Sequence, residues 1–265
     1  MGKPHVVMFS FGLGSYAAAK RVIAKHGVGQ VLLLHCATKY EDPDTDRWGY
    51  RAAEILGAEL QVIADGRDPW EVFRDERYLG NTRADPCSKI LKRQLADRWM
   101  VEHYEPSQCV RYVGYHWSEM DRLEGIKARL EPKGWRVEAP MCEAPFVAYS
   151  KLQEEAVADG LWVQQLYKDG FPHANCGGRC VKQGQAGWKR LLETHPDRYA
   201  ECEGKEEEMR QMLGKDVAMM RDRRNKKLLP LTLRRFREEL EAGGQCDLFD
   251  WGGCGCFSGG EEGLT

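Results

Sequence analysis

The sequence predicts an α/β fold in which a mostly parallel sheet carries helices on both faces, followed by a C-terminal helical region. Over the first 140 residues, short apolar runs alternate with helix-like stretches, and this alternation is typical of strands joined by right-handed helical crossovers. After about Pro140 the strand pattern fades. We therefore expect an α/β domain over residues 1–140 and a helical region with a cysteine-rich tail over residues 141–265, packed on that domain.

Four segments of the first part have the length and the Val, Leu and Ile content of buried strands: residues 5–10, 30–36, 59–64 and 109–115. The stretches 15–27 and 45–58 place apolar residues at helical spacing, and each has a glycine near its end as a candidate C-cap. Ligands of parallel sheets bind beyond the carboxyl ends of the strands. The loop that follows the first strand is therefore a candidate site.

The second part contains two long helical patterns, residues 150–170 and 184–214. The last stretch, 243–265, is rich in glycine and too short to fold independently. We expect it to pack on the rest of the chain.

The total charge of the chain is too small to produce a strong overall electrostatic field. The 265 residues carry 39 Lys and Arg against 41 Asp and Glu, a formal net charge of -2, so any nucleic-acid or membrane contact has to be local. No window approaches the ~18 consecutive apolar residues of a membrane span. The sequence also lacks a basic leader followed by an apolar segment, and we expect a soluble, cytoplasmic protein. Ten cysteines in such a protein indicate metal or redox chemistry more than a disulfide framework.

The loop Ser10-Phe-Gly-Leu-Gly-Ser15 lies between a predicted strand and a predicted helix. Backbone N–H groups in such a turn, helped by the helix dipole, can bind an anion. The loop is not a P-loop, because no Gly-Lys-Ser/Thr follows, and not a dinucleotide fingerprint, because the third glycine would fall at Tyr16 or Ala17. The spacing alone leaves two readings open, an anion site and a capped turn.

The loop resembles the PP-loop, Ser-Gly-Gly-x-Asp-Ser, of the ATP-pyrophosphatase superfamily, in particular the branch of phosphoadenosine phosphosulfate (PAPS) reductase and the adenine nucleotide alpha hydrolases. Ser10, Gly12 and Ser15 match, whereas Phe11 replaces a glycine and Gly14 replaces the aspartate. Three further segments follow in the order of that family. They are residues 37–45, with Thr38, Glu41, Pro43 and Thr45 matching; residues 113–122, with Gly114, Glu119 and Arg122 matching; and residues 166–180, with Leu-Tyr-x-x-Gly-Phe before two cysteines.

The resemblance implies an adenine nucleotide alpha hydrolase-like fold and a nucleotide site. The phosphates would lie on the loop, the adenosine would lie near Thr38, and Arg122 would line the opposite side of the phosphates, where a planar guanidinium can bind two oxygens at once. Arg122 in a surface ion pair with Glu119 or Asp121 is the alternative. The full set of expected nucleotide-binding residues is Ser10, Phe11, Gly12, Leu13, Gly14, Ser15, Thr38, Gly114 and Glu119.

The implied activity is that of a PP-loop enzyme. It would bind ATP with Mg²⁺, release pyrophosphate and adenylate a substrate for sulfur transfer from a sulfur donor, as in nucleic-acid or nucleotide modification. One alternative is an adenylylsulfate or PAPS reductase that uses a thiol reductant. Another is a non-catalytic nucleotide- or cluster-binding regulator, which the departures at Phe11 and Gly14 favour.

Five cysteines stand out. In the related adenylylsulfate reductases, a Cys-Cys pair followed by a lysine begins the iron–sulfur ligand set. Cys87 stands in the place of the first cysteine, Ser88 replaces the second, and Lys92 follows in register. The resemblance makes Cys87, Lys92 and Arg122 the candidate catalytic residues. Cys87 is then either a cluster ligand or a reactive thiol near the nucleotide.

Soft thiolates from distant segments suit an iron–sulfur cluster or a structural zinc. We expect a 4Fe-4S cluster, with zinc as the alternative, on Cys176, Cys180, Cys254 and Cys256. The alternative set takes Cys87 and three of those four. The tail cysteines would instead be the nucleophiles of a PAPS reductase in the second functional reading, although their acidic surroundings would repel a polyanionic substrate.

Residues 221–240 hold eight Lys and Arg. They form either a solvated helix face or a contact to a nucleic-acid backbone through residues 221–237.

Overall fold

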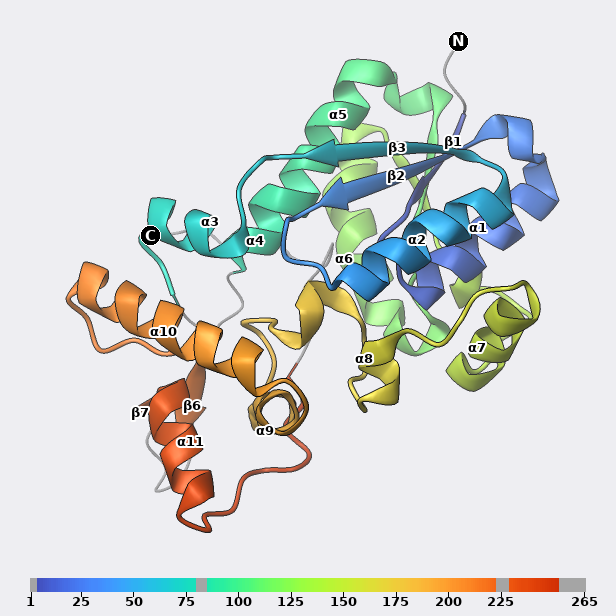
Figure 1. Cartoon of the computed structure of the whole chain (residues 1–265). Coiled ribbons are helices and arrows are strands. Elements are labelled where there is room, and N and C mark those ends of the chain that lie inside the picture. The colour runs from blue at the N-terminus through green and yellow to red at the C-terminus, as the bar shows by residue number, and fades with distance from the viewer. Residues whose placement is uncertain (1–3, 80–84, 223–228, 253–265) are drawn as a thin grey trace.

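The computed structural model describes residues 4–79, 85–222 and 229–252. At its centre is a sheet of five strands in the order β3-β2-β1-β4-β5, and every neighbouring pair is parallel (Figure 1). The strands are β1 (His5–Met8), β2 (Val31–Ala37), β3 (Glu59–Ala64), β4 (Val110–Tyr112) and β5 (Arg136–Glu138). The order of strands reverses between β1 and β4, so the switch point of the sheet lies beyond their carboxyl ends.

Helices cover both faces of the sheet. Val7 of β1 faces a core shared with α1 (Leu13–His26), α2 (Pro43–Leu56) and α7 (Tyr149–Ala158). Val6 and Met8 face a second core, shared with α5 (Leu95–His103) and α6 (Met120–Leu130). Strands buried on both faces read as continuous apolar runs, which is why residues 5–10 and 30–36 were predictable. The expected α/β fold class is confirmed.

Local signals set the ends of the predicted helices. Asp42 caps α2 by accepting a hydrogen bond from the amide of Asp44 (2.8 Å), and Pro43 occupies the first turn. The left-handed Gly57 ends α2, and Gly27, also at positive φ, ends α1. The glycine C-caps expected from the sequence are therefore present. Gly12 begins α1 without a side-chain cap.

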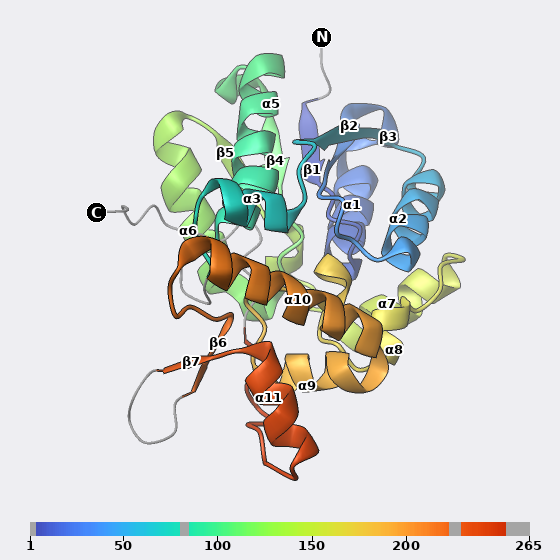
Figure 2. The same ribbon diagram turned by 60° about the vertical axis from the view of Figure 1, so that its left-hand side comes forward.

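A third core joins the helical region to the sheet domain. Trp188 of α9 (Gln185–Thr194), Tyr199 of α10 (Pro196–Leu213) and Phe236 of α11 (Leu233–Glu241) pack with Tyr40, which follows β2, and with Trp70 of α3 (Pro69–Asp75). Figures 1 and 2 both place α9, α10 and α11 together at one end of the molecule. The short helices α4 (Pro86–Ser88) and α8 (Gln165–Lys168) complete the set, and a π-helical turn, Lys89–Gln94, joins α4 to α5.

The second part is less purely helical than expected. Its pattern 184–214 is broken into two helices at Pro196, and an antiparallel pair, β6 (Met220–Asp222) and β7 (Leu229–Leu231), precedes α11. The buried carboxylate of Glu206 ties these pieces together, because it accepts hydrogen bonds from the amides of Met219 (2.8 Å) and Leu233 (2.6 Å). Within the described residues, no helix has both the length and the apolar character that a membrane crossing requires.

Candidate functional site

The loop after β1 is anchored in the core by an aromatic side chain. Phe11 has φ +60, a left-handed conformation that favours glycine, and its ring is fully buried. The ring stacks on His35 with centroids 3.6 Å apart, and a Cβ built on Gly49 of α2 would lie 2.0 Å from it. The backbone at position 11 thus has a conformation that suits glycine, while the phenyl ring fills a space that Gly49 leaves open.

The first turn of α1 presents amides and hydroxyls at the switch point. The first intrahelical hydrogen bond runs from the Tyr16 amide to the Gly12 carbonyl (3.1 Å), so the amides that precede Tyr16 belong to the open end of the helix. The Ser15 hydroxyl donates to the Gly12 carbonyl (2.8 Å), and the Ser10 hydroxyl lies 3.4 Å from the Ser15 hydroxyl. No acidic residue lies in this turn. Such an end is suited to an anion.

Two glycines bring α1 and the end of β4 into backbone contact. A Cβ on Gly14 would lie 2.4 Å from the carbonyl oxygen of Gly114, and a Cβ on Gly114 would lie 2.5 Å from the backbone nitrogen of Ser15. Neither position has room for a side chain. The aspartate of the PP-loop pattern cannot be accommodated at Gly14 without moving the loop after β4, which gives a physical reason for this departure.

Glu119 and Arg122 lie beside this contact. Arg122 forms an ion pair with Glu119 and its guanidinium lies over the ring of Tyr115, 4.5 Å from the centroid. The hydroxyl of Tyr149 donates to Glu119 (3.4 Å) and lies 3.9 Å from the position that a Cβ on Gly14 would take. The ion pair anticipated as an alternative for Arg122 is therefore present, and it lies next to the loop.

Tyr149 was not among the expected residues. Desolvation of its hydroxyl, which lies at the inner end of a partly exposed side chain, and the charge of Glu119 raise the pKa of Tyr149 above its ordinary value, so the hydroxyl stays protonated and acts as a donor. The sequence offers no signal for it, because Tyr149 begins a helix far along the chain from Ser10.

A buried charged group lies on the β2 side of the loop. The hydroxyl of Thr38 donates to Glu41, and the ammonium of Lys92 lies 3.2 Å from the other oxygen of that carboxylate. Burial alone would raise the pKa of Glu41, but the charge of Lys92 and the hydrogen bond from Thr38 lower it. Burial lowers the pKa of His35 to about 4, so the ring that supports Phe11 is neutral.

Lys92 reaches this site from the π-helical turn. Leu91, Lys92 and Arg93 are consecutive and all buried, so this turn is covered on more than one side. Arg93 points to Asp85, with nitrogen to oxygen distances of 2.8 and 3.2 Å. π-Helical turns recur at functional sites. Lys92 is thereby directed to Glu41.

The expected metal ligands are only partly within the described residues. Cys176 begins a run of three left-handed residues that continues through Gly177 and Gly178, and Cys180 follows the turn, half-buried. Cys254 and Cys256 lie outside the described residues. Among residues 4–79, 85–222 and 229–252, no group of three or more His, Cys, Asp or Glu side chains is arranged to hold a metal. The described part of the expected set is therefore two cysteines.

The described end of the tail lies along the segment after Cys180. Gly252 pairs with Gln183 in an antiparallel bridge. The carbonyl of Asp250 accepts from the amide of Ala186 (2.9 Å), and its carboxylate accepts from the amide of Gln185 (3.3 Å). The tail is thus tied to the start of α9.

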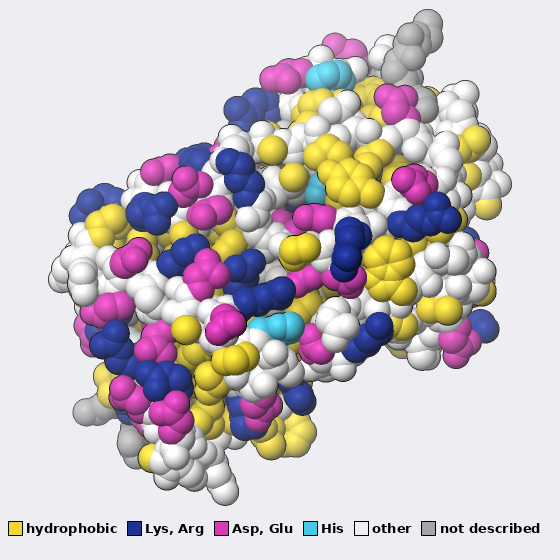
Figure 3. All heavy atoms as spheres, in the orientation of Figure 1, with side chains coloured by type: hydrophobic (Ala, Val, Ile, Leu, Met, Phe, Trp, Pro, Cys, Tyr) yellow, Lys and Arg dark blue, Asp and Glu magenta, His cyan; other side chains and the backbone are white. Residues whose placement is uncertain are grey.

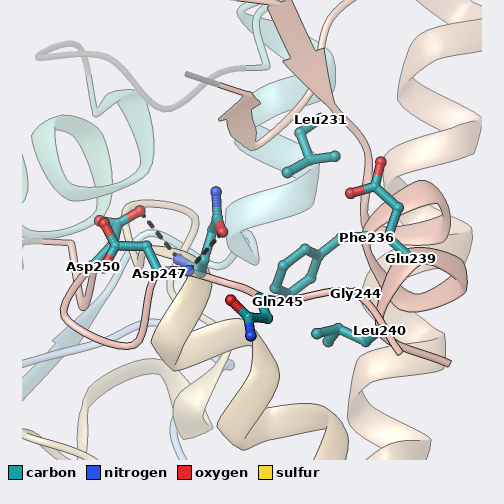
Figure 4. Close-up of a pocket in the computed structure, with 9 residues that line it drawn as sticks. Leu231, Phe236, Glu239, Leu240, Gly244, Gln245, Asp247 and Asp250 are labelled. Atoms are coloured by element: carbon teal, nitrogen blue, oxygen red, sulfur yellow. Dashed lines mark hydrogen bonds between the residues drawn. The ribbon is translucent and has the colours of Figure 1, made fainter. Parts of the chain in front are cut away.

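A cavity of about 340 Å³ lies between β7, α11 and the tail, away from the loop after β1 (Figure 4). Leu231, Phe236 and Leu240 supply apolar surface, and Glu239, Asp247 and Asp250 supply carboxylates. These acidic groups make the cavity unsuited to a nucleotide polyanion.

Arg234, Arg235 and Arg237 of the basic stretch are paired with acidic residues. Arg235 lies 3.1 Å from Asp222, and Arg237 lies 2.9 Å from Glu203. Residues 223–228 lie outside the described part. The pairs favour the solvated-face reading over a nucleic-acid contact at this place.

No family model and no curated protein matches the sequence. Similar solved structures include the NH3-dependent NAD synthetase of Campylobacter jejuni, with 11% identity over 93% of this chain and 89% of that chain and a TM-score of 0.40. A protein described as a predicted subunit of tRNA methyltransferase from Methanocaldococcus jannaschii has 17% identity over 58% of this chain and 73% of its own, with a TM-score of 0.38. The U34-tRNA thiolase of Methanococcus maripaludis, solved with its 4Fe-4S cluster, has 14% identity over 78% and 72%, with a TM-score of 0.36. Likenesses of this size assign neither a family nor an activity.

Proposed function

We propose that the chain is an ATP-dependent enzyme that releases pyrophosphate and transfers the adenylyl group to an acceptor, which sulfur then attacks. The observation that carries the proposal is the contact of Gly14 with Gly114 at the switch point of the sheet. It holds the open end of α1, with the hydroxyls of Ser10 and Ser15, against the loop after β4, which leads to Glu119 and to Arg122 of α6. Amides and hydroxyls on one segment and a guanidinium on the other are thus brought to the same side of the sheet.

In this proposal the phosphates bind at the open end of α1, and the adenosine extends along the β2 side toward Thr38. Arg122 exchanges part of its contact with Glu119 for the phosphates, because a guanidinium can serve a carboxylate and a phosphate together. Glu119 is already engaged by Arg122, Tyr149 and the amide of His116. Magnesium therefore comes as part of MgATP, since it prefers phosphate and water oxygens.

Catalysis would consist of positioning and charge neutralisation. The fixed amides of the loop and Arg122 would stabilise the charge that grows on the leaving pyrophosphate. The acceptor oxygen attacks the α-phosphorus, the bond from the α-phosphorus to the bridging oxygen breaks, and pyrophosphate leaves with the electron pair. The acceptor's proton passes to solvent or a nearby base.

We further propose a 4Fe-4S cluster, with zinc as the alternative, on Cys176, Cys180, Cys254 and Cys256. Two cysteines of this set flank a tight turn, and the described end of the tail lies beside the segment that follows Cys180. The described residues alone do not complete the set. If bound, the cluster would supply a soft sulfur- or thiolate-binding centre; Cys87 is kept as its alternative ligand or as a reactive thiol.

The test measures MgATP binding by calorimetry and pyrophosphate release with a panel of nucleic-acid and small acceptors, using anaerobic protein. Ser10→Ala and Arg122→Gln should weaken MgATP binding. The matched control Ser107→Ala, an exposed serine before β4, should leave it unchanged.

Absence of MgATP binding to the wild-type protein would overturn the proposal. Binding without pyrophosphate release from any acceptor would favour a regulator. Sulfite release from PAPS or adenylylsulfate with thioredoxin would identify a reductase instead.

A further inference from the structure

Beside the loop after β1, four large side chains are exposed to solvent. Trp117 is 42% exposed, Met120 50%, Phe146 61% and Tyr149 42%. Three of them are aromatic and form a row with the ring of the buried His116. The centroids of Phe146 and Trp117 lie 6.2 Å apart, that of His116 lies 4.9 Å from Trp117, and that of Tyr149 lies 4.4 Å from His116. We call Trp117, Phe146 and Tyr149 the aromatic surface. Large exposed apolar groups that lie together usually mark a binding site.

We infer that the aromatic surface stacks against a base of a single-stranded nucleic acid, the acceptor of the adenylyl group. That this base accepts the adenylyl group rests on the proposed function. Binding of the base to the aromatic surface is a separate property that can be measured without it. Bases of single strands are bound by stacking on exposed aromatic rings.

Hydrogen bonds hold the aromatic surface in place. The carbonyl of Val147 lies 2.8 Å from the ring nitrogen Nε2 of His116 and accepts from the indole of Trp117 (3.2 Å). Arg21 of α1 donates to the carbonyls of Pro140 (2.7 Å) and Pro145 (2.6 Å). The loop that carries Phe146 is therefore fixed from both sides. A surface that is already ordered loses little entropy when a ligand binds.

The position of the aromatic surface fits an acceptor and not the adenosine of ATP. It comes from the segments that follow β4 and β5, whereas Thr38 follows β2 on the other side of β1. Tyr149 connects it to the loop, because its hydroxyl reaches Glu119 (3.4 Å) and approaches Gly14. A base on these rings would lie next to the phosphates.

Size favours a nucleic-acid base over a protein partner. A stable protein interface takes roughly 20 residues a side, and the aromatic surface has three. The formal net charge of the chain is -2, and Lys and Arg side chains are interspersed with Asp and Glu on the one face of the molecule that Figure 3 shows, so the chain carries no strong overall positive field. Binding should depend on stacking more than on backbone charge, and its salt dependence should be shallow.

The experiment uses the full chain and a short fluorescein-labelled single-stranded RNA of mixed sequence. An abasic chain of the same length reports the contribution of the backbone alone. Phe146→Ala and Trp117→Ala should each weaken binding of the RNA roughly 5- to 100-fold, whereas Phe146→Trp should retain it. The matched control is Phe249→Ala, since Phe249 is 94% exposed on the tail. Trp117→Phe should bind the RNA, but the RNA should quench its tryptophan fluorescence less than it quenches that of the wild type.

Equal binding of RNA and the abasic chain, full binding by Phe146→Ala and Trp117→Ala, or no binding by the wild-type protein would each overturn the inference. So would sedimentation of the wild type as a dimer that Phe146→Ala converts to monomers, because the aromatic surface would then join two copies. MgATP calorimetry separates the two proposals. A wild-type protein that binds RNA but not MgATP would contradict the proposed function and leave the present inference standing. If Phe146→Ala binds MgATP normally, its loss of RNA binding is due to the lost contact with the base.

Discussion

Gly14 and Gly114 meet backbone to backbone, and a methyl group on either would enter the space of the other segment. We predict that Gly114→Ala lowers the free energy of unfolding by ~1–3 kcal/mol, the usual effect of overpacking, and abolishes MgATP binding, because the open end of α1 is displaced. Urea denaturation and calorimetry measure the two effects. Gly125→Ala in α6 meets no atom within 4 Å and serves as the control. Normal MgATP affinity in Gly114→Ala would contradict the role given to this contact.

Phe11→Gly would restore the residue of the PP-loop pattern, yet we expect it to destabilise the protein. Removing a left-handed non-glycine residue relieves about 1–2 kcal/mol, but deleting a buried phenyl ring loses about 3–5 kcal/mol. The loss of packing is the larger effect, so Phe11→Gly should lower the free energy of unfolding by roughly 1–4 kcal/mol. Urea denaturation beside the exposed-site control Phe249→Gly tests this. Equal stability of Phe11→Gly and wild type would mean that the ring contributes little.

Lys92 and Glu41 form a buried pair, with side chains 8% and 6% exposed. Lys92→Met leaves the carboxylate buried without its cation, and we expect a loss of ~3–5 kcal/mol. The double variant Lys92→Met/Glu41→Gln should recover most of that stability, as thermal and urea unfolding would reveal. If the double variant is as unstable as the single one, the effect of Lys92 is packing and not charge. Pyrophosphate release by the stable double variant then reports whether Lys92 is also catalytic.

Glu206 should make stability depend on pH. Burial raises its pKa to about 7 from 4.5, although the hydrogen bonds from the amides of Met219 and Leu233 act in the opposite direction. The pKa of Glu206 is higher in the folded than in the unfolded protein, so Glu206 contributes most to the free energy of unfolding below about pH 4.5. This contribution, up to ~3 kcal/mol, is lost as pH rises through about 7. Glu206→Gln cannot ionise, so the stability difference between wild type and variant should shrink over this window in urea titrations. A difference that is constant with pH would refute the assignment.

Iron and sulfide content tests the cysteine set. Anaerobic wild-type protein should contain both, and Cys176→Ser, Cys180→Ser, Cys254→Ser and Cys256→Ser should each lose them. Cys246→Ser, also in the tail but outside the set, should keep them. Loss only in Cys87→Ser and three of the four would support the alternative set, and bound zinc without iron would support the structural alternative.

The sequence predicted the elements whose signal is local. β1 and β2 are continuous apolar runs, and Asp42, Pro43 and Gly57 delimit α2. β5 has only three residues with one of them buried, and β7 contains Pro230, so neither carries a strand pattern. These strands form because neighbours supply their hydrogen bonds.

The candidate site was predictable to the same extent. Ser10 and Ser15 follow from a short motif, but the partners of Gly14 and Lys92, namely Gly114 and Glu41, become contacts only when distant segments fold together. The sequence did not predict that the rings of Trp117 and Phe146 are exposed, because the exposure of a residue depends on which distant segments pack over it. Whether the cysteines meet also depends on Cys254 and Cys256, which lie outside the described residues.

The stacking of Phe11 on His35 has a consequence for how the loop responds to its ligand. A loop with glycine at position 11 samples many shapes when empty and must be ordered each time a ligand arrives. Here the ring fixes the shape while the chain folds, so the entropy is lost at folding and not at each encounter. The loop should therefore have the same form with and without the proposed anion, and association should proceed without a slow isomerisation step.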